Sequence, residues 1–354
     1  MIGRLVTLVA AVVGIAMTGG CSTIGYYYQA ARGQLAITWA ARPIEAVIAD
    51  PAITPALRAR LETARDLRDF ASHELALPDN ASYRRYADLK RPFVVWNVFA
   101  AAEFSIKARE WCFPVAGCVG YKGWFDERDA TRFAQSVRQE GYDVFVGGVP
   151  AYSTLGWFDD PMLSTFIRYP RAEVARLVFH ELAHQVAYAD GDSTFNESFA
   201  TSVELEGVRR WLAHAGSDAE RAEFGAMQMR KHDFVALVER TRERLARLYA
   251  SGLPAEAMRA AKRGAFDDMR LEYAALKRAW GGFAGYDRWF AQPLGNAHLA
   301  SIATYTQRLP AFEALLAREK GILPHLYTQA KRLARLSQAD RDRELGVLTI
   351  PREP

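Results

Sequence analysis

The sequence predicts a mainly helical fold that carries a small β-sheet, an α+β arrangement. Apolar residues recur at helical spacing from position 207 almost to the end of the 354-residue chain. Dense runs of β-forming residues at 93–99 and 143–149 predict two strands. Because no Gly/Ser/Pro-rich linker divides the chain, we expect residues 21–354 to form a single domain.

The elements of this domain follow one another in a simple order. We expect the sheet within about 93–160, a pair of helices that bear polar residues within about 171–215, and a helical body within about 218–336. The polar tail from about 338 is expected to fray. Helices are expected at 57–75, 130–140, 207–215, 218–251, 255–280, 297–317 and 325–336.

The first 20 residues have the pattern of an export signal. Arg4 provides a positive start, and Leu5–Met17 is an apolar run that is too short to span a membrane. Small residues then precede Cys21, as in the bacterial lipobox, so Cys21 is expected to be lipidated; ordinary signal-peptide cleavage is the alternative. By analogy with Gram-negative lipoproteins, Ser22 favours the outer membrane, with the protein facing the periplasm.

Two further cysteines, Cys112 and Cys118, are separated by five residues. An exported chain meets an oxidising compartment, so a short-loop disulfide is predicted. Two buried thiols are the alternative. A zinc site at this pair is disfavoured because no further cysteine or histidine lies nearby.

The charge pattern argues against a nucleic-acid partner. The net charge is only +4, and acidic and basic residues are interspersed along the chain. A DNA- or RNA-binding surface is expected to have a basic stripe interleaved with aromatic residues, and the sequence shows no such stripe. No nucleic acid is therefore expected as a partner.

The most informative motif is His180-Glu181-Leu182-Ala183-His184, an H-E-x-x-H within an apolar helical pattern. Histidines four residues apart project from the same helical face, so both imidazoles can bind one Zn²⁺ ion. Glu181 would then lie beside the metal as a general base. The alternative is a buried helix with two hydrogen-bonded histidines.

A catalytic zinc ion needs a third protein ligand and an open position for water. Glu197 is the leading candidate, and together with His180 and His184 it gives the two-His, one-Glu set of the gluzincin metallopeptidases. Glu204 and Asp190 are the rival ligands. Because Glu204 lies seven residues after Glu197, it is also a candidate for orienting a histidine N–H from outside the metal site. Gly191 is expected to end the first helix, with 192–194 capping the next.

Taken together, these segments resemble the bacterial predicted-aminopeptidase lipoproteins, over about residues 26–317. The segments that carry the resemblance are SYRRYADLKRP, VVWNVFAAAEFS, WCFPVAGCVGYKGWF, AYSTLGWFDDP, FHELAHQ, FNESFA and NAHLASIATY. The resemblance implies a gluzincin-like fold and zinc-dependent hydrolysis of a peptide substrate. It implies His180, His184 and Glu197 as ligands and Glu181 as the base.

Other site residues are less sharply indicated. In gluzincins a strand beside the active-site helix binds substrate by β-addition, and residues 151–158 are the candidate here. Packing of their aromatic side chains over the core is the alternative. The substrate-binding residues would be Tyr152, Ser153, Thr154 and Gly156.

Two further roles need side chains that the motifs do not fix. The oxyanion requires a donor besides the metal, for which Tyr305 leads and His298 and Tyr152 follow. An aminopeptidase also needs an acid to hold the substrate ammonium group, and Glu103 and Asp159 are equally placed. His73, His214, His232 and His325 are expected to be structural or surface residues.

The function that this pattern favours is a zinc aminopeptidase tethered to a membrane. A zinc endopeptidase is the alternative within the same class. A catalytically silent envelope lipoprotein with a structural metal site is the alternative from another class. The intact motif favours an enzyme, since a structural site has no use for Glu181.

Overall fold

A computed structural model describes residues 24–113, 117–306 and 308–348, and the backbone alone at 303–306. The fold is mainly helical with small sheets, as predicted. The helices are α2 (Ile44–Ile48), α3 (Pro55–His73), α4 (Glu127–Gln139), α5 (Arg171–His184), α6 (Ser193–Ala215), α7 (Asp218–Tyr249), α8 (Ala255–Ala279), α9 (Asp287–Phe290), α10 (Asn296–Thr306), α11 (Leu309–Arg318), α12 (Leu323–Ala334) and α13 (Gln338–Leu348). The strands are β1 (Arg42–Pro43), β2 (Arg85–Ala87), β3 (Val95–Ala102), β4 (Trp111–Phe113), β5 (Gly117–Val119), β6 (Lys122–Trp124), β7 (Tyr142–Val149) and β8 (Met162–Leu163).

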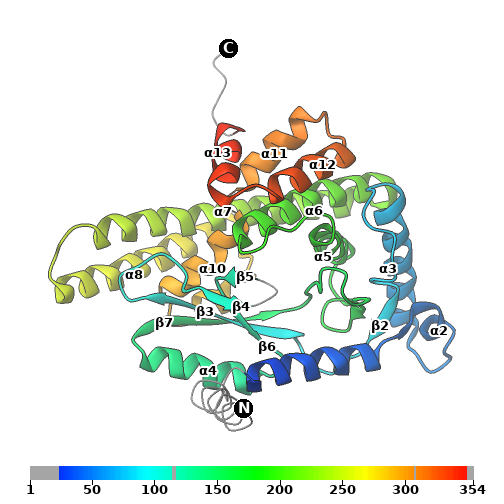
Figure 1. Cartoon of the computed structure of the whole chain (residues 1–354), viewed down its shortest axis with the longest axis horizontal. Helices are drawn as coiled ribbons and strands as arrows, with labels where there is room; N and C mark the ends of the chain where they lie inside the picture. Colours follow the sequence, from blue (N-terminus) through cyan, green and yellow to red (C-terminus); the bar gives the residue numbers. More distant parts are fainter. Residues whose placement is uncertain (1–23, 114–116, 307, 349–354) are drawn as a thin grey trace, which may run out of the picture.

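The main sheet has the order β6-β3-β7 and is antiparallel throughout. Its two long strands are the two runs of β-formers that the sequence singled out. Alternate residues of β3 face opposite layers, as the two-residue period of a strand requires. Trp96 and Val98 pack with α4, whereas Phe99 and Ala101 pack with Ala297 of α10. The sheet is thus held between α4 and the helical body (Figure 1).

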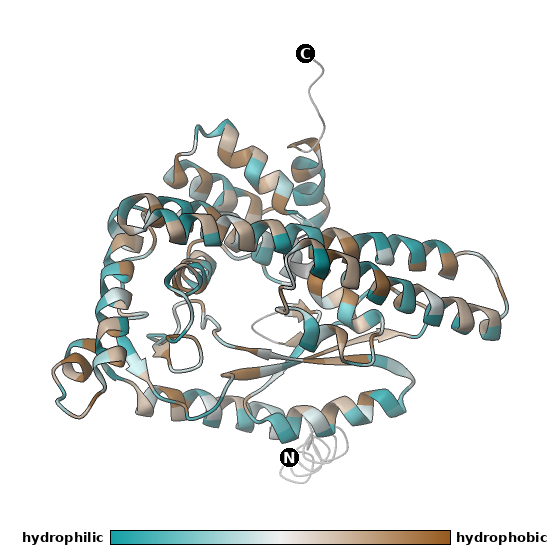
Figure 2. Ribbon diagram, turned by 180° about the vertical axis from the view of Figure 1, so that it is seen from behind, coloured by the Kyte–Doolittle hydropathy of each residue, from teal (hydrophilic) through white to brown (hydrophobic). Residues whose placement is uncertain are grey.

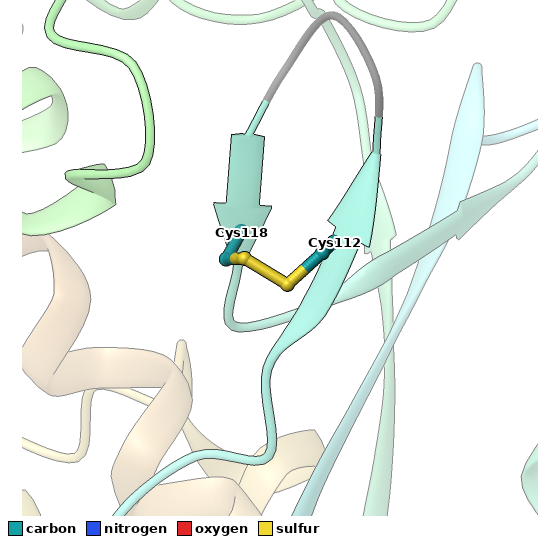
Figure 3. Close-up of a disulfide and its surroundings, with 2 residues drawn as sticks. All are labelled: Cys112 and Cys118. Atoms are coloured by element: carbon teal, nitrogen blue, oxygen red, sulfur yellow. A yellow bond between two sulfur atoms is a disulfide. The ribbon is translucent and has the colours of Figure 1, made fainter.

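A disulfide-closed hairpin precedes β6, the short edge strand of this sheet. Strands β4 and β5 pair antiparallel, with Cys112 directly opposite Cys118. A disulfide joins the two cysteines (Figure 3). A Cβ atom added to Gly117 would lie 2.7 Å from the backbone nitrogen of Gly191. The hairpin therefore packs closely against the loop between α5 and α6.

Helix α6 lies at the centre of the helical part and contacts α3, α5, α7, α10 and α11. It is buried along most of its length, including Phe195, Phe199 and Val203. Helices α7 and α8 form a long pair on one side, and apolar and polar residues alternate along both (Figure 2). This pattern lets each helix bury one stripe and expose the other.

The loop between α5 and α6 differs from the sequence prediction. Helix α5 ends at His184 rather than at Gly191, so eight residues separate the two helices. The side chain of Asp192 caps α6, accepting a hydrogen bond of 2.9 Å from the backbone N–H of Phe195. Gly191 has φ of +75° and makes the turn into that cap. The glycine thus leads into the cap of the second helix rather than ending the first, and the cap at Asp192 lies within the predicted 192–194.

Two predictions for the C-terminal part were wrong. The pattern at 297–317 is two helices, α10 and α11, and Pro310 lies in the first turn of α11. Residues 338–348 of the tail form α13 instead of fraying, and Arg341 of this helix is buried. The Nε of Arg341 donates to Asp192 at 2.9 Å, and its Nη1 donates to the carbonyls of residues 333, 334 and 336 at the end of α12.

None of the helices within the described ranges is long and apolar enough to cross a bilayer. The apolar run Leu5–Met17 and Cys21 lie outside the described residues.

The ion pair between Arg341 and Asp192 generates a prediction about stability. Arg341→Met should lower the free energy of unfolding by about 3–5 kcal/mol, because Asp192 would remain buried without its counter-ion. Arg343→Met is the matched control, since Arg343 is exposed on the same helix. The control should change stability by no more than about 0.5 kcal/mol. Equal effects of the two variants in urea denaturation would contradict this account of α13.

Candidate metal centre

The candidate centre lies between α5 and α6, which pack against each other along their lengths. Every residue of α5 from Leu177 to His184 is buried. His180 and His184 point the same way from successive turns, with ring centroids 4.8 Å apart. Glu197 comes from the second turn of α6 and is also buried. Polar groups in such surroundings require strong partners.

The donor atoms of these three residues form a compact triangle. The Nε2 atoms of His180 and His184 are 3.1 Å apart. Glu197 Oε2 lies 3.1 Å from Nε2 of His180 and 3.7 Å from Nε2 of His184. Ligand atoms about 2.0–2.1 Å from a tetrahedral zinc ion lie roughly 3.3 Å from one another. Within the described part of the chain, this is the group of His, Cys, Asp and Glu side chains that could hold a metal ion.

Glu204 occupies the outer position rather than the metal site. Its Oε2 lies 2.8 Å from His180 Nδ1, the ring nitrogen that faces away from the triangle. Arg176 Nη1 lies 3.2 Å from the same oxygen, and Lys231 Nζ lies 3.6 Å from Oε1. Burial alone would raise the pKa of Glu204, but Arg176 and Lys231 lower it to about 2. Glu204 is therefore a carboxylate that keeps the proton of His180 on Nδ1, which leaves Nε2 free to bind a metal.

The two histidines differ in their electrostatic surroundings. Burial lowers the pKa of His184 to about 4, so its imidazole is neutral and suited to a metal. Burial acts on His180 in the same direction, yet hydrogen bonds to Glu197 and Glu204 raise its pKa to about 10. These carboxylates favour a positive charge at the triangle. At Nε2, the ring nitrogen that faces Glu197, a metal ion would take the place of the second proton of His180, and the proton on Nδ1 would remain.

Glu181 is buried one residue after the first histidine. Burial, and then the negative charge of Glu197, raise the pKa of its carboxyl group to about 8, although His180 acts in the opposite direction. A cation at the triangle would lower that pKa by attraction. A carboxyl group whose pKa lies near neutrality is suited to accept and return a proton.

Comparison with known proteins identifies the family of the chain. The model of the family described as "Putative aminopeptidase" matches residues 25–345. The chain belongs to this family. No curated protein and no solved structure matches the chain. The family name supports a peptidase-like function and a peptide substrate, and the kind of metal is a separate question.

Several side chains proposed from the sequence have other partners in this member of the family. Glu103 is paired with Arg259 of α8, whose Nε donates to it at 2.6 Å, and α8 does not contact α5 or α6 closely. Asp159 is exposed. His298 packs on Phe145 and accepts from the backbone N–H of Gly295 at 3.2 Å.

Tyr305 lies in α10, but its side chain is outside the described part, so its role stays a prediction. Asp190 is exposed and is not part of the triangle.

The segment 151–158 does not form the expected strand. Thr154 turns the chain instead: its N–H and hydroxyl donate to Asp160 at 2.9 and 2.8 Å. Gly156 has φ of +83° and lies next to Gln185, the residue after His184. Tyr152 donates its hydroxyl to Gln34. The loop reaches the end of α5, and its role in substrate binding stays a prediction.

Sequence reasoning missed several residues around the centre. The side-chain amide of Asn196 exchanges two hydrogen bonds with the backbone of Ala189, of 2.7 and 2.9 Å, and so fixes the loop between α5 and α6. Tyr188 lies with its ring 6.5 Å from His184, and its place one helical turn after that residue was a usable signal. Tyr121 immediately precedes β6, and burial and then Glu197 raise the pKa of its hydroxyl. Nothing in the sequence indicated Tyr121.

The buried loop acid Asp160 generates a pH prediction. Burial raises the pKa of Asp160 from 3.8 to about 6. Its contribution to stability is therefore complete below about pH 4 and is lost as the pH rises through about 6. Each tenfold change in proton affinity corresponds to about 1.4 kcal/mol, so the loss is about 3 kcal/mol.

Asp160→Asn should remove this dependence while keeping the loop. The amide oxygen of the introduced asparagine can accept a hydrogen bond from the Thr154 N–H. Its amide nitrogen can donate to the Thr154 hydroxyl, because that hydroxyl can itself donate to the carbonyl of Phe158, 3.2 Å away. In urea denaturation the variant should gain up to about 3 kcal/mol over the wild type between pH 4 and 7. A difference that stays constant over this range would contradict a protonated Asp160.

Proposed function

We propose that the protein is a zinc-dependent aminopeptidase, and the triangle of His180, His184 and Glu197 is the observation that carries the proposal. Its donor spacing fits a tetrahedral ion, and its two-His, one-Glu composition is that of catalytic rather than structural zinc sites. A purely structural site would not need the buried Glu181 beside it. The family to which the chain belongs supports hydrolysis of peptides.

In the proposed reaction, each of the residues around the triangle has a separate role. When bound, zinc lowers the pKa of a coordinated water molecule and polarises the substrate carbonyl. Glu181 accepts the proton from the attacking water and passes it to the leaving amine nitrogen. Glu204, held by Arg176, keeps His180 in the tautomer that the site requires. Tyr305 remains our candidate for stabilising the oxyanion.

The loop 151–160 is the proposed wall of the substrate site, with Tyr152, Ser153, Thr154 and Gly156 as contacts. Exposed Asp159 in that loop is the better candidate for the substrate ammonium group, because Glu103 is held by Arg259. A cavity of about 530 Å³ lies at the start of α6, lined in part by Ser193 and Thr194, but its lining does not include His180, His184 or Glu197. Ser193 and Thr194 are one helical turn before Glu197.

We also propose that the enzyme is exported and lipid-anchored through Cys21, facing the periplasm from the outer membrane. The sequence of residues 1–22 supports this proposal. Mass spectrometry of the mature N-terminus tests it, since an acylated Cys21 is the expected first residue. An unmodified N-terminus would contradict it.

The general base generates the first functional prediction. Glu181→Gln keeps the shape of the side chain but cannot accept a proton, so turnover of an aminoacyl amide should fall about 10²–10⁴-fold. Zinc content should remain at the wild-type level, because Glu181 is not part of the triangle. Full activity in the variant would rule out this role for Glu181. Hydrolysis of internally quenched peptides but not of aminoacyl amides by the wild type would favour an endopeptidase.

The carboxylate of Glu204, which contacts His180 on the side away from the triangle, generates the second functional prediction. Glu204→Gln should weaken zinc binding about 10–100-fold in competition with a chelator, because the charge that orients His180 is lost. Glu206→Gln is the matched control, since Glu206 is on the same helix and pairs only with Arg209 and Arg210 in the contacts described. Its zinc affinity should be that of the wild type. Equal affinity in both variants would show that Glu204 does not tune the metal.

A further inference from the structure

The helix over residues 24–40 uses only one of its faces to hold the fold. On that face, the Tyr26 ring stacks on Phe113 at 5.5 Å and meets Trp124 edge-on at 5.3 Å. Gln29 accepts a hydrogen bond of 3.1 Å from the backbone of Phe125. Ile37 is buried in the main core. These contacts fix the orientation of the helix against the sheet.

The opposite face is apolar and open. Ile24, Tyr28, Leu35 and Trp39 are 64%, 66%, 43% and 80% exposed. Their spacings of four, seven and four residues align them along a single stripe of the helix. Ala31 lies in the gap of that stripe and is exposed as well. Arg32 is the one charged residue between positions 24 and 40.

Such a stripe needs an explanation. Single exposed apolar residues are ordinary on protein surfaces, but a contiguous row marks a surface that contacts another apolar phase. Tryptophan and tyrosine have an apolar ring and a polar edge, and they gather where hydrocarbon meets water. A helix with this composition on one face and without acidic residues suits the interface of a lipid bilayer.

The chain that precedes the helix points to the same partner. The described residues begin at Ile24, and Cys21, the proposed lipidation site, lies three residues earlier. A lipid attached there would hold the start of the helix at the membrane surface. One anchor of this kind is stabilised by a second contact, and the stripe can supply it.

We propose that the helix over residues 24–40 lies flat in the interfacial layer of a lipid membrane, with Ile24, Tyr28, Leu35 and Trp39 facing the lipid. This rests on the proposed anchor at Cys21 but not on the peptidase chemistry. The helix lies along one edge of the molecule and α11–α13 along the opposite edge, so the C-terminal helices would point away from the membrane (Figure 1). The hydrogen bond from Tyr152 to Gln34 links this helix directly to the loop 151–160.

A probe at Leu35 tests the proposal. Cys112 and Cys118 are joined in a disulfide, so Leu35→Cys in the mature lipidated protein can be labelled with an environment-sensitive fluorophore. Leu271→Cys is the matched control, since Leu271 is 71% exposed on α8. With vesicles of phosphatidylethanolamine and phosphatidylglycerol, emission at position 35 should shift to shorter wavelength, rise severalfold and be quenched by spin-labelled lipid. Emission at position 271 should not change.

Three results would overturn the proposal. In the first, the protein floats with the vesicles while position 35 behaves like position 271, so that the lipid alone makes contact. In the second, the protein does not float with vesicles at all. In the third, the probe at position 35 is already shielded without vesicles, which would indicate a second copy of the chain on this face.

A second measurement does not depend on labelling. Leu35→Asp combined with Trp39→Asp should speed transfer of the lipidated protein between vesicles severalfold, because only the acyl anchor remains. Leu271→Asp should leave the transfer rate unchanged. An unchanged rate in the double variant, with thermal unfolding like that of the wild type, would also overturn the proposal.

Discussion

The fold depends on a set of polar side chains buried between α5 and α6. His180, His184, Glu197 and Glu204 all lie in the interior, where an unpaired charge would destabilise the protein by several kcal/mol. Hydrogen bonds link three of them, and Arg176 and Lys231 supply positive charge from one side. The triangle on the other side still carries a carboxylate opposite two ring nitrogens. In the function that we propose, a divalent cation balances this charge.

Much of the surrounding structure serves to keep α5 and α6 in register. The amide of Asn196 fixes the loop between them, and the pair of Asp192 with Arg341 ties the start of α6 to the last helix of the chain. The disulfide hairpin packs on Gly191 in the same loop. Side chains from distant parts of the sequence thus converge on the eight residues that separate α5 from α6. The position of Glu197 relative to the histidines follows from that convergence.

The sequence predicted the features that depend on residues close together in the chain. It failed for features that depend on contacts with residues far away in the chain. The spacing of His180 and His184 within an apolar helix was sufficient to place both imidazoles on one face, and the seven-residue interval between Glu197 and Glu204 identified an outer carboxylate. The two β-former runs became the two long strands. The prediction that the tail frays was wrong for residues 338–348. Arg341 is a charged residue in a polar segment, but it is buried because it pairs with Asp192, 149 residues earlier in the chain.

Loops resisted prediction for a related reason. The residues around Thr154 do not indicate that its N–H and its hydroxyl both donate hydrogen bonds to Asp160. These two bonds turn the chain, so that no strand forms. Glycine at 191 signals a turn but does not say which helix the turn belongs to. Tyr121 follows the hairpin in the chain and is brought near Glu197 by long-range packing, so it has no local signature. Side chains that reach a site through long-range packing therefore cannot be predicted from a single sequence.

X-ray absorption at the zinc edge tests the central claim most directly. The purified protein should contain one zinc ion per chain, with two imidazole nitrogens and carboxylate oxygen at about 2.0–2.2 Å and one further light atom from solvent. His184→Ala should reduce the imidazole contribution by half if the ion is retained. A metal-free protein that does not take up zinc, or a zinc shell without imidazole, would contradict the account.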